Sequence, residues 1–289
     1  MNKVAIVTGA NSGIGRSTAV HLATQGWTVY GTMRGLDKGV KLRAMCEAAG
    51  VEVLPLVCDV TDGATVTAAV DKVIADTGRI DAIVNNAGIA SNGTVEETSL
   101  ERYEQVMDAN LLGIIRFVQA VLPHMRERGE GCIVNVSSVI GRFASPGQAA
   151  YTASKWAVEG LSEELAHEVA AFGVRVVILE PGIVRTAMLA KNVDAPNESG
   201  AYDHTYGRMF SLYAAGLSDA GTPDQAAEII FEAITTDEPK LRWTCGWGGA
   251  ELAAAADSVD SDAFVALGAA DDDAFYEGFE NLFGLNIRA

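Results

Sequence analysis

Short runs of apolar residues alternate with longer stretches of helical periodicity through most of the chain. The first run, residues 4–7, is apolar at every position, which is typical of a strand buried on both faces of a parallel sheet. The runs predict strands at residues 4–7, 27–32, 51–58, 80–84, 132–137 and 174–179. The periodic stretches predict helices at residues 16–25, 36–49, 65–77, 100–128, 151–172 and 224–235. Five or six strand–helix repeats without hairpin signals predict an α/β fold with a doubly wound parallel sheet.

Two segments depart from this alternation. Residues 187–216 are rich in Met and Tyr without clear periodicity, and a long insert after a strand of such a sheet is a candidate substrate lid. The alternative is a peripheral packing segment. Residues 251–289 contain nine Asp or Glu against one Arg and predict a partly helical, acidic C-terminal extension without recognisable chemistry. We therefore expect a single catalytic domain over residues 1–250, which includes the lid, followed by this extension.

A glycine-rich turn, residues 8–15, follows the first predicted strand and opens the first predicted helix. Glycines let the backbone turn tightly and let a pyrophosphate approach the N–H groups at a helix N-terminus. The GxxxGxG spacing differs from the standard GxGxxG fingerprint, but its position between a strand and a helix predicts a Rossmann-type dinucleotide site. The cofactor-binding candidates in this turn are Gly9, Asn11, Ser12, Gly13, Ile14 and Gly15.

The end of the second predicted strand bears on the choice of nucleotide. An NAD site needs a carboxylate about twenty residues past the glycines, where it binds the ribose 2′-OH. Met33 stands at this position and Arg34 follows it. A guanidinium suits a bidentate grip on a 2′-phosphate, so we expect NADP(H) rather than NAD(H), unless Arg34 is only a solvated loop residue. Asp59, at the end of the third predicted strand, could bind the adenine amino group or cap the next helix.

Residues 138–155 contain three side chains of complementary chemistry. Tyr151 and Lys155 are spaced i, i+4 and therefore share one face of a predicted helix. A nearby cation favours the phenolate and lowers the pKa of the tyrosine. Ser138 could hold a carbonyl oxygen, so the three groups could exchange a proton with an alcohol/ketone pair. Because Tyr-x-x-x-Lys also occurs by chance on amphipathic helices, the surrounding motifs decide between the two interpretations.

The composition of the chain limits the kinds of partner that it could bind. The net charge of −17 argues against nucleic acid or an anionic membrane. The four cysteines lack metal-binding spacing, so we expect reduced thiols in a cytoplasmic protein and no metal site. We also expect no signal peptide, because a strand-like run begins at residue 4, and no membrane helix, because no apolar run reaches about 20 residues.

Taken together, the motifs resemble the short-chain dehydrogenase/reductase family. The matches are TGxxxGxG at residues 8–15, NNAG at 85–88, Asn110, Ser138, YxxxK at Tyr151 and Lys155, and Pro181, Gly182 and Thr186. They occur in the family's order and spacing over residues 1 to about 186, whereas residues after 240 match no family pattern. Residues 29–34, VYGTMR, are similar to NADP-preferring hydroxysteroid and retinol dehydrogenase-like members.

The resemblance implies roles for these residues. Tyr151 would be the acid/base, and Lys155 would lower its pKa and bind the nicotinamide ribose. Ser138 would hold the substrate oxygen, Asn110 would support a water-linked proton relay, and Thr186 with the backbone of Ile183 would hold the carboxamide. The implied cofactor residues beyond the glycine turn are Arg34, Asp59, Val60, Asn86, Ala87, Gly88, Tyr151, Lys155, Pro181, Gly182, Ile183 and Thr186. The expected substrate residues are Ser138, Ile140, Tyr151, Met188, Tyr202 and Tyr206.

We therefore expect an NADP(H)-dependent oxidoreductase that interconverts a secondary alcohol and a ketone. The Met- and Tyr-rich lid favours a bulky apolar small molecule as substrate, because apolar surface gains free energy on burial. Family resemblance implies a homodimer or homotetramer. Two alternatives share the fold: a non-catalytic NADP-sensing or scaffold protein, and an epimerase or dehydratase that uses the cofactor only transiently.

Overall fold

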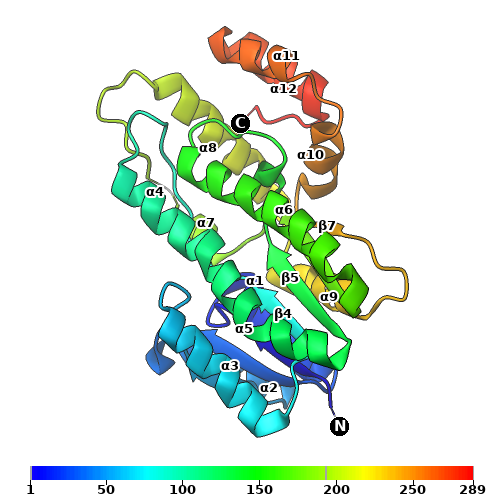
Figure 1. The fold of residues 1–289 in the computed structure, drawn as a ribbon. Helices are drawn as coiled ribbons and strands as arrows, with labels where there is room; N and C mark the ends of the chain where they lie inside the picture. The colour runs from blue at the N-terminus through cyan, green and yellow to red at the C-terminus, as the bar shows by residue number, and fades with distance from the viewer. Residues whose placement is uncertain (1, 193, 289) are drawn as a thin grey trace.

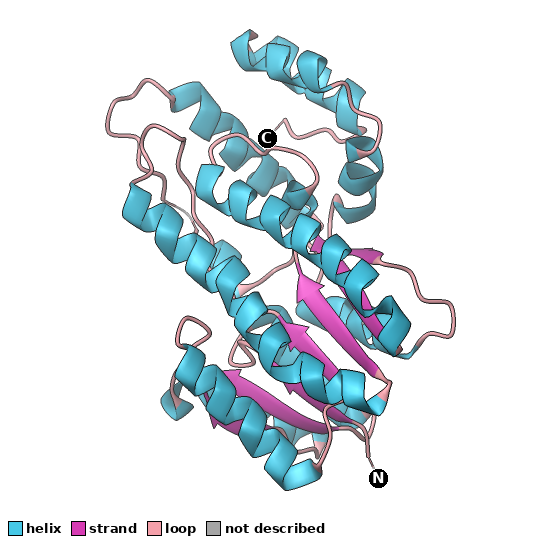
Figure 2. Ribbon diagram, in the orientation of Figure 1, coloured by secondary structure: helices cyan, strands magenta, loops and turns pink. Residues whose placement is uncertain are grey.

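A parallel sheet lies between two layers of helices, and a further group of helices lies beyond one edge of the sheet (Figures 1 and 2). The structure is a computed structural model that describes residues 2–192 and 194–288. Within these residues, seven parallel strands pair in the order β3-β2-β1-β4-β5-β6-β7, which confirms the predicted doubly wound sheet. The strands are β1 (Val4–Val7), β2 (Thr28–Met33), β3 (Leu54–Val57), β4 (Ala82–Asn85), β5 (Gly131–Val136), β6 (Val174–Pro181) and β7 (Arg242–Cys245).

The seventh strand, β7, was not predicted from the sequence. It has four residues, pairs only with β6 in the sheet, and alternates between half-buried and buried positions. Such a short edge strand lacks the continuous apolar run by which the other strands are recognised. Strand β6 also extends two residues further than predicted, to Pro181.

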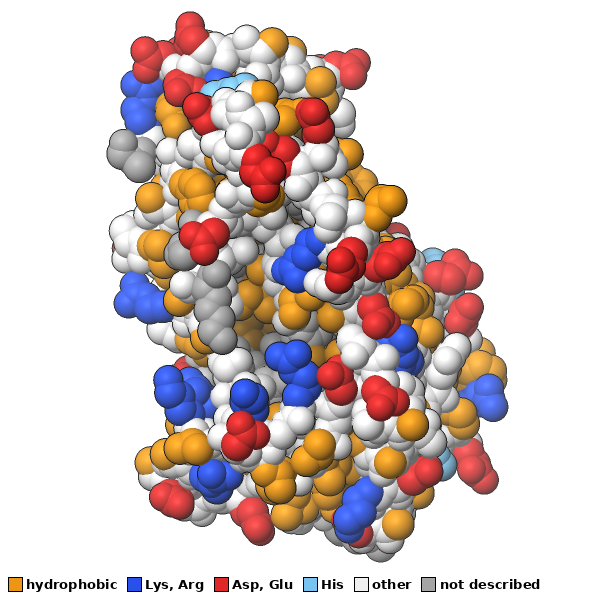
Figure 3. All heavy atoms as spheres, turned by 90° about the vertical axis from the view of Figure 1, so that its left-hand side faces the viewer, with side chains coloured by type: hydrophobic (Ala, Val, Ile, Leu, Met, Phe, Trp, Pro, Cys, Tyr) orange, Lys and Arg blue, Asp and Glu red, His pale blue; other side chains and the backbone are white. Residues whose placement is uncertain are grey.

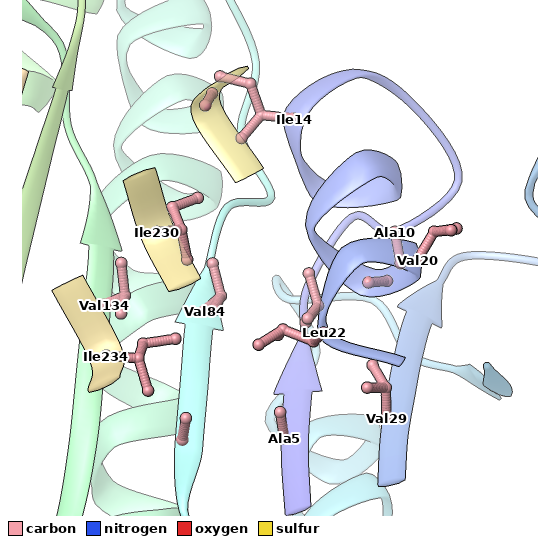
Figure 4. Close-up of a cluster of buried hydrophobic side chains, with 14 of the residues drawn as sticks. Ala5, Ala10, Ile14, Val20, Leu22, Val29, Val84, Val134, Ile230 and Ile234 are labelled. Carbon is pink, nitrogen blue, oxygen red and sulfur yellow. The ribbon is translucent and has the colours of Figure 1, made fainter. Parts of the chain in front are cut away.

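The two faces of the sheet carry separate hydrophobic cores, because successive side chains of a strand point to opposite faces. Ala5 and Val7 of β1 pack with the first helical layer, part of which Figure 4 shows, and Ile6 packs with the second. The first layer contains α1 (Gly13–Thr24), α2 (Val40–Ala49) and α9 (Pro223–Thr235). The second layer contains α3 (Gly63–Thr77), α5 (Gly113–Arg128) and α6 (Ala149–Val169).

Residues 100–128 form one long helical stretch. It consists of α4 (Leu100–Met107), a π-helical segment (Asp108–Leu112) and α5. Among the described residues, it is the one helix long and apolar enough to cross a membrane, by length and composition alone. However, Phe117 and Met125 on this helix are fully buried in the second core, as in the core helix of a globular fold.

The strand order reverses beside β1. The chain first runs outward from β1 to β2 and β3, and then returns to β4 on the other side of β1. In sheets of this kind, ligands bind beyond the carboxyl ends of the strands at the point of reversal. The loops that leave β1, β4, β5 and β6 therefore meet at one edge of the sheet, and these loops contain most of the predicted site residues.

The remaining helices lie beyond this edge (Figure 1). They are α7 (Ala187–Lys191), α8 (Asp203–Ser218), α10 (Gly249–Ala256), α11 (Ser261–Ala266) and α12 (Asp272–Phe283). Helix α8 is regular, although the sequence of the expected lid showed no clear period. The C-terminal helices confirm the expected helical content, but α10 spans the domain boundary expected at residue 250, and that division stays a prediction.

The C-terminal helices pack on the lid and on the loop after β5. Phe143 of this loop shares a third hydrophobic core with Phe275 and Phe279 of α12. Arg208 of α8 is only 4% exposed, lies 2.9 Å from a carboxylate oxygen of Asp272, and stacks over the ring of Phe275. The lid and the C-terminal extension are therefore joined by buried contacts.

Candidate active site

One cavity of about 950 Å³ crosses the carboxyl edge of the sheet. Figure 3 shows the molecule hollowed across its middle, with Lys and Arg side chains near the hollow. The cavity extends from the glycine-rich turn past β2 and the catalytic candidates to Trp247 and Leu252. It brings together most of the residues that the sequence singled out, although they come from distant parts of the chain.

The glycine-rich turn forms the floor at one end of the cavity. Gly9 and Gly13 have φ of 68° and 53°, a conformation that residues with a Cβ rarely adopt. A Cβ at Gly15 would lie 2.3 Å from the amide nitrogen of Asn86, so this glycine is needed for close packing although it does not line the cavity. Ser12 makes no capping hydrogen bond and the first turn of α1 contains no acid, which leaves helix N–H groups for an anion.

Thr8 fastens the NNAG segment to this turn. Its hydroxyl accepts hydrogen bonds from the backbone N–H groups of Asn86 and Ala87, both at 2.9 Å. The side-chain amide of Asn86 donates back to the carbonyl of Thr8, also at 2.9 Å. Asn86, Ala87 and Gly88 then line the cavity as predicted. These contacts, the uncapped helix and the tight glycine turn fit a dinucleotide, whose pyrophosphate they would hold.

The end of β2 presents cations to the cavity. Arg34 lines it together with Lys38, which the sequence analysis did not single out although it is a second cation four residues on. Asp59 and Val60 lie on the same wall, as predicted. Burial alone would raise the pKa of Asp59, but hydrogen bonds from Thr61 and the cation of Arg34 bring it below its usual value.

Two alternatives for Asp59 can now be separated. Helix α3 is capped by Asp62, whose side chain accepts from the backbone of Ala64, and not by Asp59. Asp59 instead accepts hydrogen bonds from the backbone and hydroxyl of Thr61 while it lines the cavity. It therefore remains a candidate for the adenine end of a nucleotide.

Ser138, Tyr151 and Lys155 line the same cavity, as the sequence predicts. The hydroxyl of Ser138 donates to the carbonyl of Pro181 at 3.2 Å, which fixes it at the end of β5. The ammonium of Lys155 donates to the carbonyl of Val136 at 2.8 Å and lies 5.4 Å from the ring centre of Tyr151. A serine hydroxyl, a phenol and an ammonium thus meet where a carbonyl oxygen could receive a proton.

The predicted pKa of Tyr151 is wrong in direction. Burial raises the pKa of this phenol to about 12, although the hydroxyl of Ser138 opposes the rise. Burial also lowers the pKa of Lys155 to about 8, against the attraction of Glu159. The ammonium of Lys155 favours the phenolate, but the loss of water around the phenolate disfavours it, and desolvation is the larger of the two effects.

Asn110 lies in the protein interior and does not line the cavity. Its side-chain oxygen accepts from the N–H of Ile89 at 2.8 Å, and its amide donates to the carbonyl of Ile89 and to the hydroxyl of Ser154, both at 3.0 Å. A Cβ at Gly88 would lie 2.9 Å from the same oxygen. Asn110 therefore positions the loop after β4 against α6. Its part in a water-linked relay, which the resemblance implies, stays a prediction.

The carboxamide candidates need one correction. Pro181, Gly182, Ile183 and Thr186 all line the cavity. However, the N–H and carbonyl of Ile183 are both paired with the backbone of Trp247, at 2.9 and 3.1 Å. The next residue, Val184, also lines the cavity, and neither of its backbone groups is paired within the described residues. Val184 therefore replaces Ile183 as the backbone candidate.

Two of the predicted substrate residues do not lie at the far end of the cavity. Ile140 and Met188 line it as predicted, but Tyr202 and Tyr206 do not. The hydroxyl of Tyr202 donates to Glu96, and that of Tyr206 donates to Glu97, so both tyrosines fasten the lid to the loop after β4. The helical period of α8 determines which lid tyrosines face the cavity, and this period was not recognisable in the sequence.

Tyr213 is the lid tyrosine that faces the cavity. Its hydroxyl accepts hydrogen bonds from the side-chain amides of Gln148 at 2.5 Å and Asn192 at 3.0 Å. The amide of Asn192 also donates to Asn92 at 2.7 Å. This polar cluster, Asn92, Gln148, Asn192 and Tyr213, joins the lid to the body of the protein. The apolar wall at this end of the cavity consists of residues from one hydrophobic cluster: Ile140, Phe143, Leu212, Trp247 and Leu252.

Comparison with known proteins gives a family. The family model described as short chain dehydrogenase matches residues 3–197. Oxidoreductase BOA17 of Botryotinia fuckeliana is 36% identical over 261 residues, which cover 90% of this chain and 94% of that protein. Human 17-beta-hydroxysteroid dehydrogenase type 1 is 36% identical over 254 residues, which cover 83% of this chain and 76% of that protein.

Solved structures agree with these relatives. A short-chain dehydrogenase from Streptomyces avermitilis superposes with a TM-score of 0.78 at 36% identity, covering 88% of this chain and 92% of the other. A metagenomic short-chain oxidoreductase in complex with NADP gives 0.68 at 28% identity, covering 84% and 96%. A Burkholderia phymatum enzyme in complex with NAD gives 0.74 at 29% identity, covering 84% and 88%. The chain therefore belongs to the short-chain dehydrogenase family and is an oxidoreductase.

Proposed function

We propose that this enzyme uses NADP(H) to interconvert a bulky, apolar secondary alcohol and its ketone, with Tyr151 as proton donor and acceptor. One observation carries the proposal. A single cavity places Ser138, Tyr151 and Lys155 between an anion-binding helix N-terminus and a largely apolar wall. The intact arrangement argues against a cofactor-sensing scaffold. The length of the chain and its compact lid, residues 187–216, favour a simple dehydrogenase over an epimerase or dehydratase.

The residues divide the chemistry between them. A bound nicotinamide would supply the hydride chemistry, held through its ribose by Lys155 and at its carboxamide by Thr186 and the backbone of Val184. Ser138 would orient the carbonyl oxygen of the substrate toward the phenol. With its pKa raised to about 12, Tyr151 is protonated at neutral pH and is ready to donate in the direction of ketone reduction.

Preference for NADP(H) rests on the wall at the end of β2. Arg34 and Lys38 both line the cavity there, and Met33 occupies the place of the carboxylate that an NAD site needs. A 2′-phosphate carries up to two negative charges and would be attracted by these cations. Structural neighbours bind NADP or NAD, so this preference is supported by the local charges rather than by family membership.

A bulky substrate is supported by the apolar wall, whose burial of hydrocarbon contributes about 25 cal/mol per Å². The test is a panel of ketones, from compact hydroxy-ketones to large ring ketones, assayed by cofactor absorbance with NADPH and with NADH. We expect the highest kcat/KM for a large ketone with NADPH and one alcohol formed per NADPH consumed. A higher value for every compact ketone would contradict the substrate class, and ketone conversion without net NADPH oxidation would favour the epimerase or dehydratase.

We also propose a cytoplasmic homodimer or homotetramer. The four cysteines are all free and buried, as in a reducing compartment. Trp156 on α6 is 51% exposed and Leu112 beside α5 is 42% exposed, which gives an apolar surface for a second copy. Sedimentation of the purified protein tests the assembly, and a strictly monomeric species at micromolar concentration would contradict it. Cell fractionation tests the location.

A further inference from the structure

Two buried carboxylates lie behind Lys155, on the side away from Tyr151. Glu159 follows Lys155 by four residues, as Lys155 follows Tyr151, so the three side chains form a row along one face of α6. Glu159 is 5% exposed, and Glu180 near the end of β6 is 1% exposed. Carboxylates are rarely buried to this extent without a cation, so we expect positively charged groups beside both of them.

Two arginines lie beside Glu159 and Glu180 and balance their negative charges to different degrees. Arg242 of β7 lies 3.1 Å from Glu159 and 3.0 Å from Glu180 through the same nitrogen. Arg142, after β5, lies 3.0 Å from Glu180 and also pairs with Asp257 of the C-terminal extension. Glu180 therefore meets two guanidinium groups, whereas Glu159 meets one.

The second carboxylate oxygen of Glu159 is not paired with an arginine. Its Oε1 is buried and makes no hydrogen bond within the described residues. Burial raises the pKa of Glu159 above its usual value, and Glu180 adds to the rise, whereas the hydroxyl of Ser137 and the guanidinium of Arg242 oppose it. A Cβ at Gly141 would come within 2.9 Å of Glu159 and Ser137 and 3.0 Å of the Lys155 carbonyl, so only a glycine allows them to pack this closely. A buried carboxylate that is only partly paired costs stability, and an apolar side chain would avoid that cost.

We propose, on the basis of the function proposed above, that Glu159 is a positioning residue that holds Lys155 in its charged ammonium form. The charged and hydrogen-bonding groups around Lys155 and Glu159 are Tyr151 and Glu163 from α6, Ser137, Ser138 and Arg142 from the loop after β5, Glu180 from β6 and Arg242 from β7. The charges of the two arginines balance those of the two buried carboxylates. Glu180 is paired with both arginines and Glu159 with only one, so Glu159 is the carboxylate that attracts Lys155.

The sign of the effect follows from the charges. Burial lowers the pKa of Lys155, the negative charge of Glu159 opposes this fall, and the pKa that results is about 8. Without Glu159, the ammonium would lose its proton at a lower pH, close to neutral. Residues one helical turn apart have Cβ atoms about 5–6 Å apart. An opposite charge within about 4–6 Å shifts a pKa by about one unit or more, which is enough to decide the state of Lys155 at pH 7 to 8.

The direct test is a pH titration by NMR with lysine labelled at ¹³Cε, which needs no substrate. The chain has only seven lysines, and the signal of Lys155 is the one lost in Lys155→Arg. We expect its midpoint near pH 8 in the wild type and about one unit lower in Glu159→Gln. In Glu159→Asp, which keeps the charge, most of the shift should be restored.

Glu163→Gln is the matched control. Glu163 lies one turn further along α6 and binds the same Arg242 at 3.0 Å, but its side chain is 53% exposed. Its removal should leave the midpoint of Lys155 in place. An unchanged midpoint in Glu159→Gln, or equal shifts in both variants, would overturn the proposal, since Glu159 would then only tie α6 to β7.

A second pair of variants serves if Glu159→Gln does not fold. Glu159→Met together with Arg242→Met removes both charges, an exchange that buried ion pairs often tolerate. Its Lys155 midpoint is compared with that of Arg242→Met alone, and equal values would overturn the proposal. In the active enzyme, the fall of kcat at high pH should move by the same amount as the NMR midpoint. If no ketone is reduced at all, the proposed function fails while the titration still decides the role of Glu159.

Discussion

The cofactor end and the substrate end of the cavity are built in different ways. At the cofactor end, the site is made by short motifs at the ends of neighbouring strands, and backbone geometry fixes each part. Gly9, Gly13 and Gly15 are required by φ or by close packing. At the substrate end, the walls come from contacts between distant segments, such as Asn92 with Asn192 and Arg208 with Asp272. A local motif therefore predicts the first end, whereas only the folded chain shows the second.

The largest expected effect compares one substitution at the two ends. Gly15→Ala would place a Cβ 2.3 Å from the amide of Asn86 and 2.8 Å from the carbonyl oxygen of Gly9. The glycine turn would have to shift, and the loss of about two charge-assisted hydrogen bonds to the pyrophosphate should weaken NADPH binding by about 100-fold. Gly207→Ala in α8 meets no atom within 4 Å and should stabilise the protein by about 0.5–1 kcal/mol without loss of affinity. Calorimetric titration and thermal unfolding measure both. Comparable affinities in the two variants would break the contrast.

A second effect concerns the nucleotide. Arg34→Ala should reduce the preference for NADPH over NADH, measured as a ratio of kcat/KM on one ketone, by about ten- to a hundredfold, since a charge-assisted hydrogen bond is lost. Lys38→Ala should give a smaller change in the same direction. If Arg34→Ala left the ratio of kcat/KM with NADPH to kcat/KM with NADH unchanged, a group other than Arg34 would distinguish the two cofactors.

A smaller effect sharpens the account of the lid. Tyr213→Phe removes the hydroxyl that accepts from Gln148 and Asn192, and should lower kcat/KM for a bulky ketone about fivefold, the value of about one hydrogen bond. The control is Tyr202→Phe, whose hydroxyl points to Glu96 outside the cavity and should change kcat/KM less than twofold. The reverse order would restore Tyr202 as the substrate residue.

The smallest effect is in the pH profile. Lys155, with a pKa lowered to about 8, is charged below that pH and loses its proton as the pH rises. Tyr151, with a pKa raised to about 12, stays protonated over the same range. The kcat for ketone reduction should therefore be level below pH 7 and fall to half near pH 8. A profile that stays level to pH 10 would disconnect Lys155 from turnover.

The sequence predicted most of the sheet and the positions of the motifs, because apolar runs and glycine turns are local signals. It missed β7, whose four residues at an edge alternate in burial. The sequence also gave the wrong direction for the pKa of Tyr151, because desolvation depends on atoms that the lid and loops bring together. The resemblance implied Ile183 and missed Val184, because sequence spacing does not show which backbone groups are already paired.

The substrate residues were the least predictable part of the site. The sequence gives no reason to prefer one of Tyr202, Tyr206 and Tyr213 as the substrate residue. Only the orientation of α8 shows that Tyr213 faces the cavity. The contribution of the C-terminal helices was also hidden, because Phe143 meets α12 across more than a hundred residues of sequence. Such contacts leave no local pattern in either segment.

The most direct test of the whole account is turnover by Tyr151→Phe. This change removes one oxygen from the centre of the cavity and leaves the glycine turn, Arg34 and the lid in place. The account predicts that kcat for ketone reduction with NADPH falls by at least about 100-fold, the usual contribution of a general acid, while the dissociation constant for NADPH stays within about threefold of the wild type. A Phe variant that turns over at close to the wild-type rate would contradict the assignment of Tyr151 as the acid/base and, with it, the proposed mechanism.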